Sequence, residues 1–340
     1  MSIRVGLLGL GIMGAHHART LAREVKHVEI HSLYDSDETR AHSVATEVGA
    51  KSITKDHLEL IASPEIDAVL IASPDNTHSE FVKACFDHGK PVFCEKPLAS
   101  TVTECLHLVD LEVKKGRRLL QLGFMRRFDP AYVEMKAHLT SGNFGKPLVF
   151  HHSHRNVSAP AWFDSRMAIS NSSIHEFDIA RWLLEEEFVK INVFRPRASF
   201  EASVGAPLVM VLQTRGGRLV NIEVYNNASY GYEVQGEVLC ENGTISLHAP
   251  LRTTTKLNFS MSMAYPSDWR QRFAEAYRIQ AQAWIDSIIR DIPVGASAWD
   301  GYVAAAIAEA GLASLDVDEG CVISQPDKPR LYATLSEPTH

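Results

Sequence analysis

The chain has 340 residues, of which 45% are hydrophobic and 22% charged, and its formal net charge is −7. This length allows two domains with sizeable cores, and an acidic balance without a basic block excludes the footprint of a nucleic-acid-binding protein. Apolar runs such as AVLIA at 68–72 are too short to cross a membrane, and the N-terminal residues enter a strand pattern without a cleavable signal, so we expect a cytoplasmic protein.

The first third of the chain alternates short apolar runs with segments of helical spacing. The runs typical of strands are 3–9, 28–35, 68–73, 91–96 and 118–124, and the helical patterns lie at 16–24, 37–49, 78–89 and 101–116. Regular strand–helix alternation is typical of a parallel, doubly wound sheet. We therefore predict an α/β Rossmann domain over residues 1–122.

The remainder of the chain has a different pattern. A helix is predicted at 130–141, followed by alternating strands at 147–156, 190–199, 206–215, 218–227 and 232–247, and by helices at 269–290 and 297–315. The turns RGGR (215–218) and ENGT (241–244) are hairpin signals. We predict an α+β domain over 123–340 with a large, mostly antiparallel open sheet, and we expect the helix at 297–315 to pack back on the first domain.

A glycine-rich turn joins the first predicted strand to the first helix. Its pattern G-x-G-x-x-G lets the backbone approach a pyrophosphate, which binds at the helix N-terminus. Asp35 ends the second strand, 21 residues after Gly14, where a carboxylate accepts hydrogen bonds from both ribose hydroxyls and repels a 2′-phosphate. This predicts NAD rather than NADP as the cofactor, bound by Gly9, Gly11, Ile12, Met13, Gly14 and Asp35.

Several further motifs follow in order along the chain. They are SPDNTH (73–78), CEKPL (94–98), GFMRRFDPAY (123–132), HSHRN (152–156), MAISNSSIHEFDIARWLL (167–184) and YGYEVQGEV (230–238). With the glycine turn and Asp35, they resemble the Gfo/Idh/MocA dehydrogenase family, and within it the inositol 2-dehydrogenases most. The resemblance covers nearly the whole chain. It implies a second domain whose open sheet builds dimers or tetramers, so we expect a homo-oligomer, with a tetramer as the first choice.

The resemblance also assigns roles around the EKP motif. Lys96 matches the family's active-site lysine, whose ammonium lies beside the nicotinamide and stabilises the charge that grows on the substrate oxygen as hydride leaves. Glu95 is expected to position Lys96. The predicted cofactor contacts in these two motifs are Ser73, Asn76, His78, Glu95 and Lys96.

His175 is the predicted general base. The pattern Ser173-Ile174-His175-Glu176 reads as a capping box, S-x-x-E, with Ser173 as the N-cap of a helix. That arrangement would place His175 in the first helical turn, where the positive helix end favours a neutral imidazole. A neutral imidazole is the form that removes a hydroxyl proton.

Asn171 is a departure from the family pattern, because inositol dehydrogenases usually carry an aspartate four residues before the catalytic histidine. An amide can orient the histidine but supplies no negative charge. Three interpretations stay open. In the first, Asn171 serves a substrate other than myo-inositol; in the second, the base chemistry is rearranged around Lys96; in the third, the substitution blunts activity.

The remaining pocket residues come from strand ends and loops of the second domain. Donor-rich side chains with a few aromatic faces suit a polyol, and the predicted substrate contacts are Arg127, Asn156, Trp162, Asn171, His175 and Tyr232. His152 and His154 would share one face of a strand, but no third ligand has zinc-like spacing, so we predict no metal.

These observations predict an NAD-dependent dehydrogenase that oxidises a secondary hydroxyl of a cyclitol or sugar. One alternative is an NAD-dependent glycosidase of the same fold, which oxidises its substrate transiently and keeps its cofactor. Another is a non-catalytic dinucleotide-binding regulator. The retained lysine and histidine argue against the regulator, since such proteins have usually lost one of them.

Overall fold

A computed structural model describes residues 2–196, 207–248, 254–317 and 319–333. The chain forms two compact units. The first comprises Met1–Phe128, Glu275–Ala305 and Pro326–His340, and the second Asp129–Ala274 and Ala306–Gln325. The predicted strands at 190–199 and 206–215 extend in part beyond the described residues.

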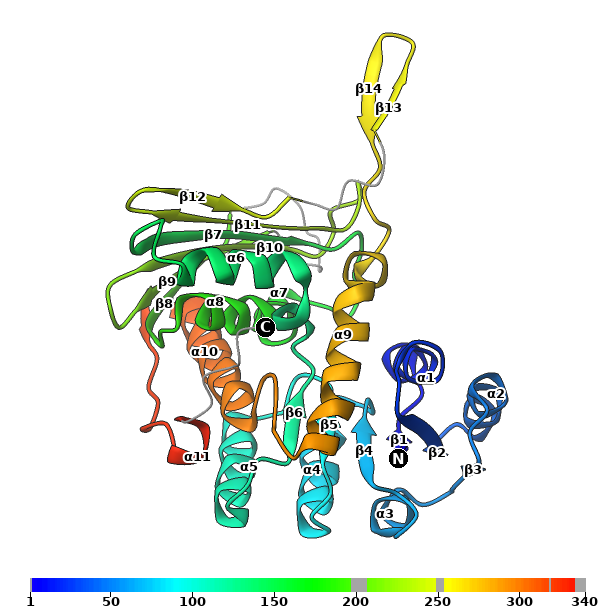
Figure 1. Cartoon of the computed structure of the whole chain (residues 1–340). Helices are drawn as coiled ribbons and strands as arrows, with labels where there is room; N and C mark the ends of the chain where they lie inside the picture. Colours follow the sequence, from blue (N-terminus) through cyan, green and yellow to red (C-terminus); the bar gives the residue numbers. More distant parts are fainter. Residues whose placement is uncertain (1, 197–206, 249–253, 318, 334–340) are drawn as a thin grey trace. The chain divides into compact units, whose positions relative to one another are not determined.

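The first unit contains a six-stranded parallel sheet in the order β3-β2-β1-β4-β5-β6 (Figure 1). Its strands are Ile3–Leu8 (β1), Val28–Tyr34 (β2), Ser52–Ile53 (β3), Ala68–Ile71 (β4), Val92–Cys94 (β5) and Leu120–Leu122 (β6). This confirms the predicted doubly wound sheet. The strand order reverses between β1 and β4, and ligands of such folds bind at this point, beyond the carboxyl ends of the strands.

Helices flank this sheet. They are Ile12–Glu24 (α1), Glu38–Val48 (α2), His57–Ala62 (α3), His78–Asp87 (α4), Val102–Lys115 (α5) and Arg330–Ala333 (α11), with short 3₁₀ turns at Asp75–Thr77 (η1) and Met125–Phe128 (η2). The later part of Trp269–Arg290 (α9) also belongs to this unit. Its Trp284 and Ile285 pack into the same core as Leu7, Leu33 and Phe93.

The second unit contains a seven-stranded sheet in the order β12-β11-β7-β10-β9-β8-β15. Its strands are Pro147–Arg155 (β7), Phe188–Phe194 (β8), Leu208–Thr214 (β9), Leu219–Tyr225 (β10), Glu233–Cys240 (β11), Gly243–Ser246 (β12) and Cys321–Val322 (β15). Every pair is antiparallel except β7 with β10. The predicted mostly antiparallel sheet is therefore confirmed, and the RGGR and ENGT turns join β9 to β10 and β11 to β12.

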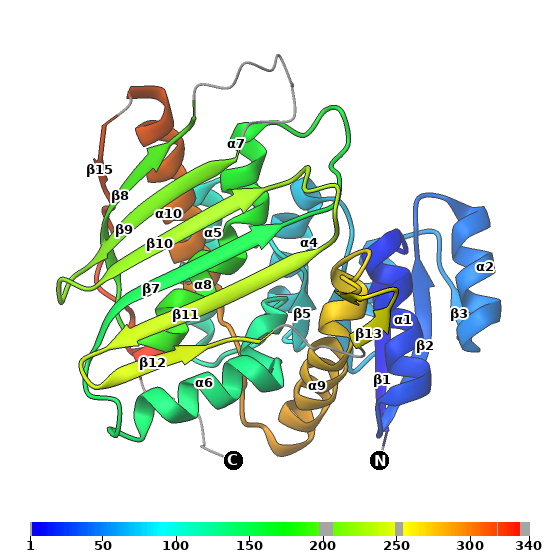
Figure 2. The same ribbon diagram turned by 90° about the horizontal axis from the view of Figure 1, so that it is seen from above.

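The helices of this unit lie over one face of this sheet (Figure 2). They are Pro130–Thr140 (α6), Ser165–Met167 (α7), Ile174–Leu184 (α8) and the later part of Ala298–Val317 (α10), and a π-helical turn, Ala168–Ser172 (η3), joins α7 to α8. In β7, Phe150, His152 and His154 are buried, whereas His151 is exposed. His152 and His154 thus share a face, as their spacing predicted.

The predicted capping box at the start of α8 is wrong. Ser173 has helical backbone angles and its side chain makes no capping bond. Its hydroxyl donates instead to the carbonyl of Ala168 at 2.7 Å, and so does its own N–H at 3.0 Å. The backbone therefore runs into α8 through the π-helical turn, and the argument that an open helix N-terminus keeps His175 neutral is lost.

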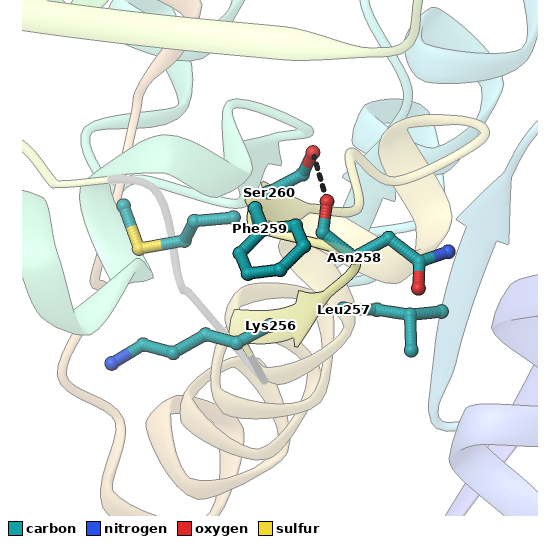
Figure 3. Close-up of a pocket in the computed structure, with 6 residues that line it drawn as sticks. Lys256, Leu257, Asn258, Phe259 and Ser260 are labelled. Atoms are coloured by element: carbon teal, nitrogen blue, oxygen red, sulfur yellow. Dashed lines mark hydrogen bonds between the residues drawn. The ribbon is translucent and has the colours of Figure 1, made fainter.

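A two-stranded hairpin, Thr254–Leu257 (β13) with Ser260–Met263 (β14), projects from the second unit. All eight of its strand residues are exposed. At its turn, Asn258 and Phe259 both have positive φ. In Figure 3 the side chains of Lys256 and Leu257 point in opposite directions, and the Phe259 ring lies between them. Among the described residues, no helix has the length and apolar character needed to span a membrane.

Candidate active site

The glycine turn between β1 and α1 has the geometry of a pyrophosphate cradle. Gly9 has a φ of +85° and passes so close to Ser73 that a Cβ atom would lie 2.5 Å from the Ser73 Cα. A Cβ on Gly14 would lie 1.9 Å from the carbonyl oxygen of Gly9. At Gly11, in contrast, a Cβ would meet no atom within 4 Å. This open space at the N-terminus of α1 fits the phosphates of a dinucleotide.

Asp35 directly follows β2, and only 8% of its surface is exposed. Its carboxylate accepts hydrogen bonds from the N–H groups of Leu10 at 2.6 Å and Asp37 at 2.8 Å. It also pairs with the half-exposed Arg40, whose Nη1 lies 3.2 Å from Oδ1. Asp35 therefore ties the glycine turn to the end of β2 and holds a carboxylate where the adenosine ribose of NAD is expected.

The SPDNTH segment forms the loop after β4 and the 3₁₀ turn η1. Ser73 and Thr77 share a hydrogen bond between their hydroxyls at 2.6 Å. His78 is 1% exposed, and its ring nitrogens lie 2.6 Å from the carbonyl oxygen of Pro97 and 3.0 Å from that of Ser73. His78 thus links this loop to the EKP motif. The predicted cofactor contacts of Ser73, Asn76 and His78 stay predictions.

The EKP motif follows β5. Glu95 is buried, Lys96 is half-buried, and the Lys96–Pro97 peptide bond is cis. The Glu95 carboxylate accepts from His17 Nε2 at 2.7 Å and from the Lys96 N–H at 3.2 Å. Burial alone would raise the pKa of Glu95, but the hydrogen bond from His17 and the electrostatic interactions with His17 and Lys96 outweigh it and lower that pKa. A carboxylate is therefore fixed directly beside Lys96.

Arg127 lies in the 3₁₀ turn η2 of the first unit. Its guanidinium pairs with Asp300 of α10 at 3.0 Å, and the side chains are 8% and 13% exposed. Asp300 in turn accepts from the N–H and the hydroxyl of Ser297. The structure therefore gives Arg127 an ionic partner, and its predicted substrate contact stays a prediction.

In the second unit, Asn171 lies in the π-helical turn and His175 in the first turn of α8, and His175 is 9% exposed. Asn226, at the end of β10, connects this region to β7. Its side-chain oxygen accepts from Asn156 Nδ2 at 2.6 Å and from the Ser172 hydroxyl at 3.2 Å. One side-chain oxygen therefore holds the predicted residue Asn156 and also Ser172, the neighbour of Asn171 in the π-helical turn.

The inner face of β7 carries a buried polar cluster. Glu176 Oε1 lies 3.1 Å from His154 Nδ1 and 3.8 Å from His152 Nδ1. The Tyr132 hydroxyl lies 2.6 Å from His152 Nε2, and the Tyr232 hydroxyl 3.4 Å from His154 Nε2. Tyr232 is 3% exposed and Trp162 is 69% exposed. Of these two predicted aromatic contacts, only Tyr232 is built into the cluster.

Three residues of these clusters were not singled out from the sequence: His17, Asn226 and Glu176. His17 follows Gly14 by three residues, a spacing that places it on the buried face of α1. Glu176 follows the predicted base directly and was assigned to a cap. Asn226 directly follows β10. The sequence around it contains no motif that would mark it as a site residue. Among the described residues, no group of three or more His, Cys, Asp or Glu side chains has the geometry to hold a metal ion.

The chain matches two family models over most of its length. Residues 3–124 match the NAD-binding Rossmann fold of the Gfo/Idh/MocA oxidoreductase family, and residues 136–319 match the C-terminal alpha/beta domain of that family. The first of these descriptions confirms the cofactor predicted from the glycine turn and Asp35.

Curated relatives and solved structures agree with these matches. The chain is 45% identical to inositol 2-dehydrogenase 1 of Saccharopolyspora erythraea, covering 98% of this chain and 100% of that protein. It is 38% identical to an inositol 2-dehydrogenase of Pseudomonas fluorescens, covering 98% and 100%. The myo-inositol dehydrogenase of Lactobacillus casei, solved with NAD(H) and myo-inositol, is 34% identical with a TM-score of 0.94 over 98% of this chain and 100% of that one. The chain therefore belongs to the Gfo/Idh/MocA family of NAD-binding oxidoreductases.

Proposed function

We propose that this protein is an NAD-dependent dehydrogenase that oxidises a secondary hydroxyl of a cyclitol, with inositols as the first substrates to test. The observation that carries the proposal is the 45% identity to an inositol 2-dehydrogenase over 98% of the chain. Lys96 and His175, the two residues that the family resemblance places at the reaction, are both present. This retention disfavours the regulator.

When bound, NAD supplies the nicotinamide ring that accepts a hydride from the carbinol carbon. His175 takes the hydroxyl proton, and the Lys96 ammonium donates a hydrogen bond to the oxygen as negative charge grows on it. The proton thus remains on the protein, and the carbon is oxidised to a ketone. Asn171, held in the π-helical turn, orients His175 or a substrate hydroxyl through its amide.

The test is the formation of NADH from NAD with a panel of inositol isomers, hexoses, pentoses and sugar acids. Wild type is compared with Lys96→Ala, which is expected to lower kcat by about 10²-fold or more because a donor to the growing charge is lost. NADH affinity, measured by the fluorescence of the reduced nucleotide, controls for folding. Turnover that survives Lys96→Ala would contradict the proposed role of the lysine.

Asn171→Asp separates the interpretations of the family departure. In a related arrangement, replacing the aspartate that orients the catalytic histidine by asparagine lowers turnover by about 10⁴-fold. If wild type is slow on inositols and this variant is much faster, Asn171 impairs or redirects the enzyme. Cleavage of a glycoside without net NADH release would instead favour the glycosidase, and bound NAD without any reaction would favour the regulator.

We further propose that the protein assembles as a homo-oligomer, a tetramer or a dimer. The β13–β14 hairpin supports this, because an isolated two-stranded ribbon is marginally stable in water and exposes Leu257, Phe259 and Met261 at 74%, 113% and 69%. The occupant expected on these side chains is a second copy of the chain. Light scattering of wild type and of Phe259→Ser tests this, and a monomeric wild type would refute it.

A further inference from the structure

We propose that His17 is a positioning residue for Lys96, acting through Glu95. The inference rests on the proposed role of Lys96 in the reaction. His17 lies on α1, the helix that opens at the glycine turn, and Glu95 lies at the end of β5, so one hydrogen bond joins the nucleotide-binding helix to the lysine loop. His17 is assigned this indirect role because its hydrogen bond goes to Glu95.

The surroundings of His17 fix its ring and its tautomer. The side chain is 1% exposed, and its ring packs edge-on against Phe93 of β5 at 5.2 Å and against Tyr277 of α9 at 5.8 Å. Nε2 lies 2.7 Å from Glu95, whereas the buried Nδ1 has no hydrogen-bonding partner among the described residues. Because a buried N–H without an acceptor is costly, the ring carries its proton on Nε2 and donates it to Glu95.

Glu95 in turn has one available orientation. Its Oε1 accepts from His17, while its Oε2 accepts from the Lys96 N–H. The carboxylate also packs on Gly123, where a Cβ atom would lie only 2.9 Å from Oε2. The two donors therefore hold the carboxyl group in place, and a side chain at position 123 would press against it.

This arrangement places a buried negative charge beside the Lys96 loop. The hydrogen bond from His17 favours the ionised form of Glu95, and Lys96 is among the groups that stabilise the same charge. Loss of the His17 donor would let the carboxyl group rotate or take up a proton. The Lys96 backbone N–H would then lose its fixed acceptor, and a displacement of about 1 Å at a catalytic group costs about 10²-fold in rate.

Two substitutions at position 17 separate positioning from packing. His17→Leu removes the donor and is expected to lower kcat by about 10- to 100-fold, with the dissociation constant of NAD nearly unchanged. His17→Gln restores an N–H at a similar reach and is expected to recover most of kcat. Thr20→Val, a buried and nearly isosteric change on the same helix, is the matched control and should keep wild-type kcat.

A double-mutant cycle with Glu95→Gln tests the route of action. If His17 acts through Glu95, then His17→Leu costs little in the Glu95→Gln background, because the carboxylate that it orients is already gone. Losses that multiply would overturn the inference, as would an unchanged kcat in His17→Leu. The inference would also be overturned if the loss of kcat in His17→Leu came with weaker NAD binding or a lower melting temperature. That result would indicate that His17 only stabilises α1.

A second readout does not depend on turnover. In ¹⁵N-histidine-labelled protein without added nucleotide, the resonances that disappear in His17→Gln identify His17 among the 16 histidines. They should show a protonated Nε2 and a bare Nδ1, and this signature should change in Glu95→Gln. A ring protonated on Nδ1 would refute the inference whatever the substrate is. If the expected signature is present but no polyol is turned over, only the proposed function is contradicted.

Discussion

The Nδ1 atom of His154 lies 3.1 Å from a carboxylate oxygen of Glu176, and the two side chains are only 6% and 0% exposed. Glu176 comes from α8, directly after the proposed base His175, and His154 from the inner face of β7. The pair therefore fixes the helix that carries the base to the strand whose end carries Asn156. Such a buried contact is expected to contribute to stability as well as to geometry.

Glu176→Ala is expected to lower the free energy of unfolding by about 1–3 kcal/mol, because it leaves a buried imidazole N–H without this acceptor. Glu176→Gln should lose clearly less, since the amide oxygen can still accept from His154 Nδ1. Urea unfolding of both variants measures the difference. Equal losses in the two variants would contradict the hydrogen-bond argument.

Much of the first unit could be predicted because its sequence signals are local. The run IRVGLL, the glycine turn and the helix after it form one strand–turn–helix unit, and each residue type is required by backbone geometry at that point. The two short elements β3 and α3 were missed. A two-residue strand has no periodicity to detect, and a six-residue helix offers fewer than two turns of pattern.

The misses at the site have a different cause. The S-x-x-E pattern at Ser173 is a valid capping signal, but tertiary context overrode it, since the preceding π-helical turn already supplies a carbonyl to the Ser173 N–H and hydroxyl. His17 has the spacing of a core residue, and only the fold reveals that Glu95 faces it. The β13–β14 hairpin has no glycine at its turn, where Phe259 has the unfavourable positive φ.

Asp35 and Arg40 are expected to determine the preference for NAD over NADP. Asp35→Ser removes the charge that repels a 2′-phosphate and releases Arg40, which can then pair with that phosphate. We expect the ratio of kcat/KM for NADP to that for NAD to rise by about 10²-fold, a change that corresponds to about 2.8 kcal/mol. Steady-state rates with both cofactors measure the ratio.

The variant Asp35→Ser with Arg40→Ala is the control for this effect. It should lose most of the gain for NADP, because no cation remains to pair with the phosphate. A gain that persists without Arg40 would show that the arginine has no part in it, and no gain in either variant would refute the assigned role of Asp35.

Gly11 and Gly14 form a matched pair for the nucleotide cradle. A Cβ at Gly11 meets no protein atom within 4 Å, while one at Gly14 overlaps the Gly9 carbonyl. Gly11→Ala should therefore keep the stability of the fold yet weaken NAD binding by about tenfold or more, as the methyl occupies the space of the pyrophosphate. Gly14→Ala should destabilise the protein itself, by about 1–3 kcal/mol.

Thermal unfolding and NAD titration of both glycine variants distinguish the two effects. The informative result is the contrast, with binding affected in one variant and stability in the other. If Gly11→Ala bound NAD as tightly as wild type, the open space at the start of α1 would not be the phosphate site.

Glu112 predicts a dependence of stability on pH. It is fully buried in α5, where its carboxylate accepts from the N–H groups of Leu119 and Leu120 at 2.6 and 2.7 Å and from the Tyr332 hydroxyl at 2.7 Å. Burial raises the pKa of Glu112 above its ordinary value of 4.5 and outweighs the opposing effect of these hydrogen bonds and of Arg118. Folding therefore shifts Glu112 towards its protonated form relative to an exposed glutamate.

The sign of the effect follows by linkage. A raised native pKa means that the stabilising contribution of Glu112 is complete below pH 4.5 and is lost as pH rises through the native pKa. Glu112→Gln stays neutral throughout, so its free energy of unfolding relative to wild type should move in favour of the variant from acidic to neutral pH, by at most about 1.4 kcal/mol per pH unit. Urea unfolding across this range measures the difference, with Asp110→Asn, an exposed change on the same helix, as the control. The opposite result is a difference in free energy of unfolding that does not change with pH, or that shifts in favour of wild type as pH rises. It would show that the three hydrogen bonds outweigh burial and that Glu112 is ionised in the native protein.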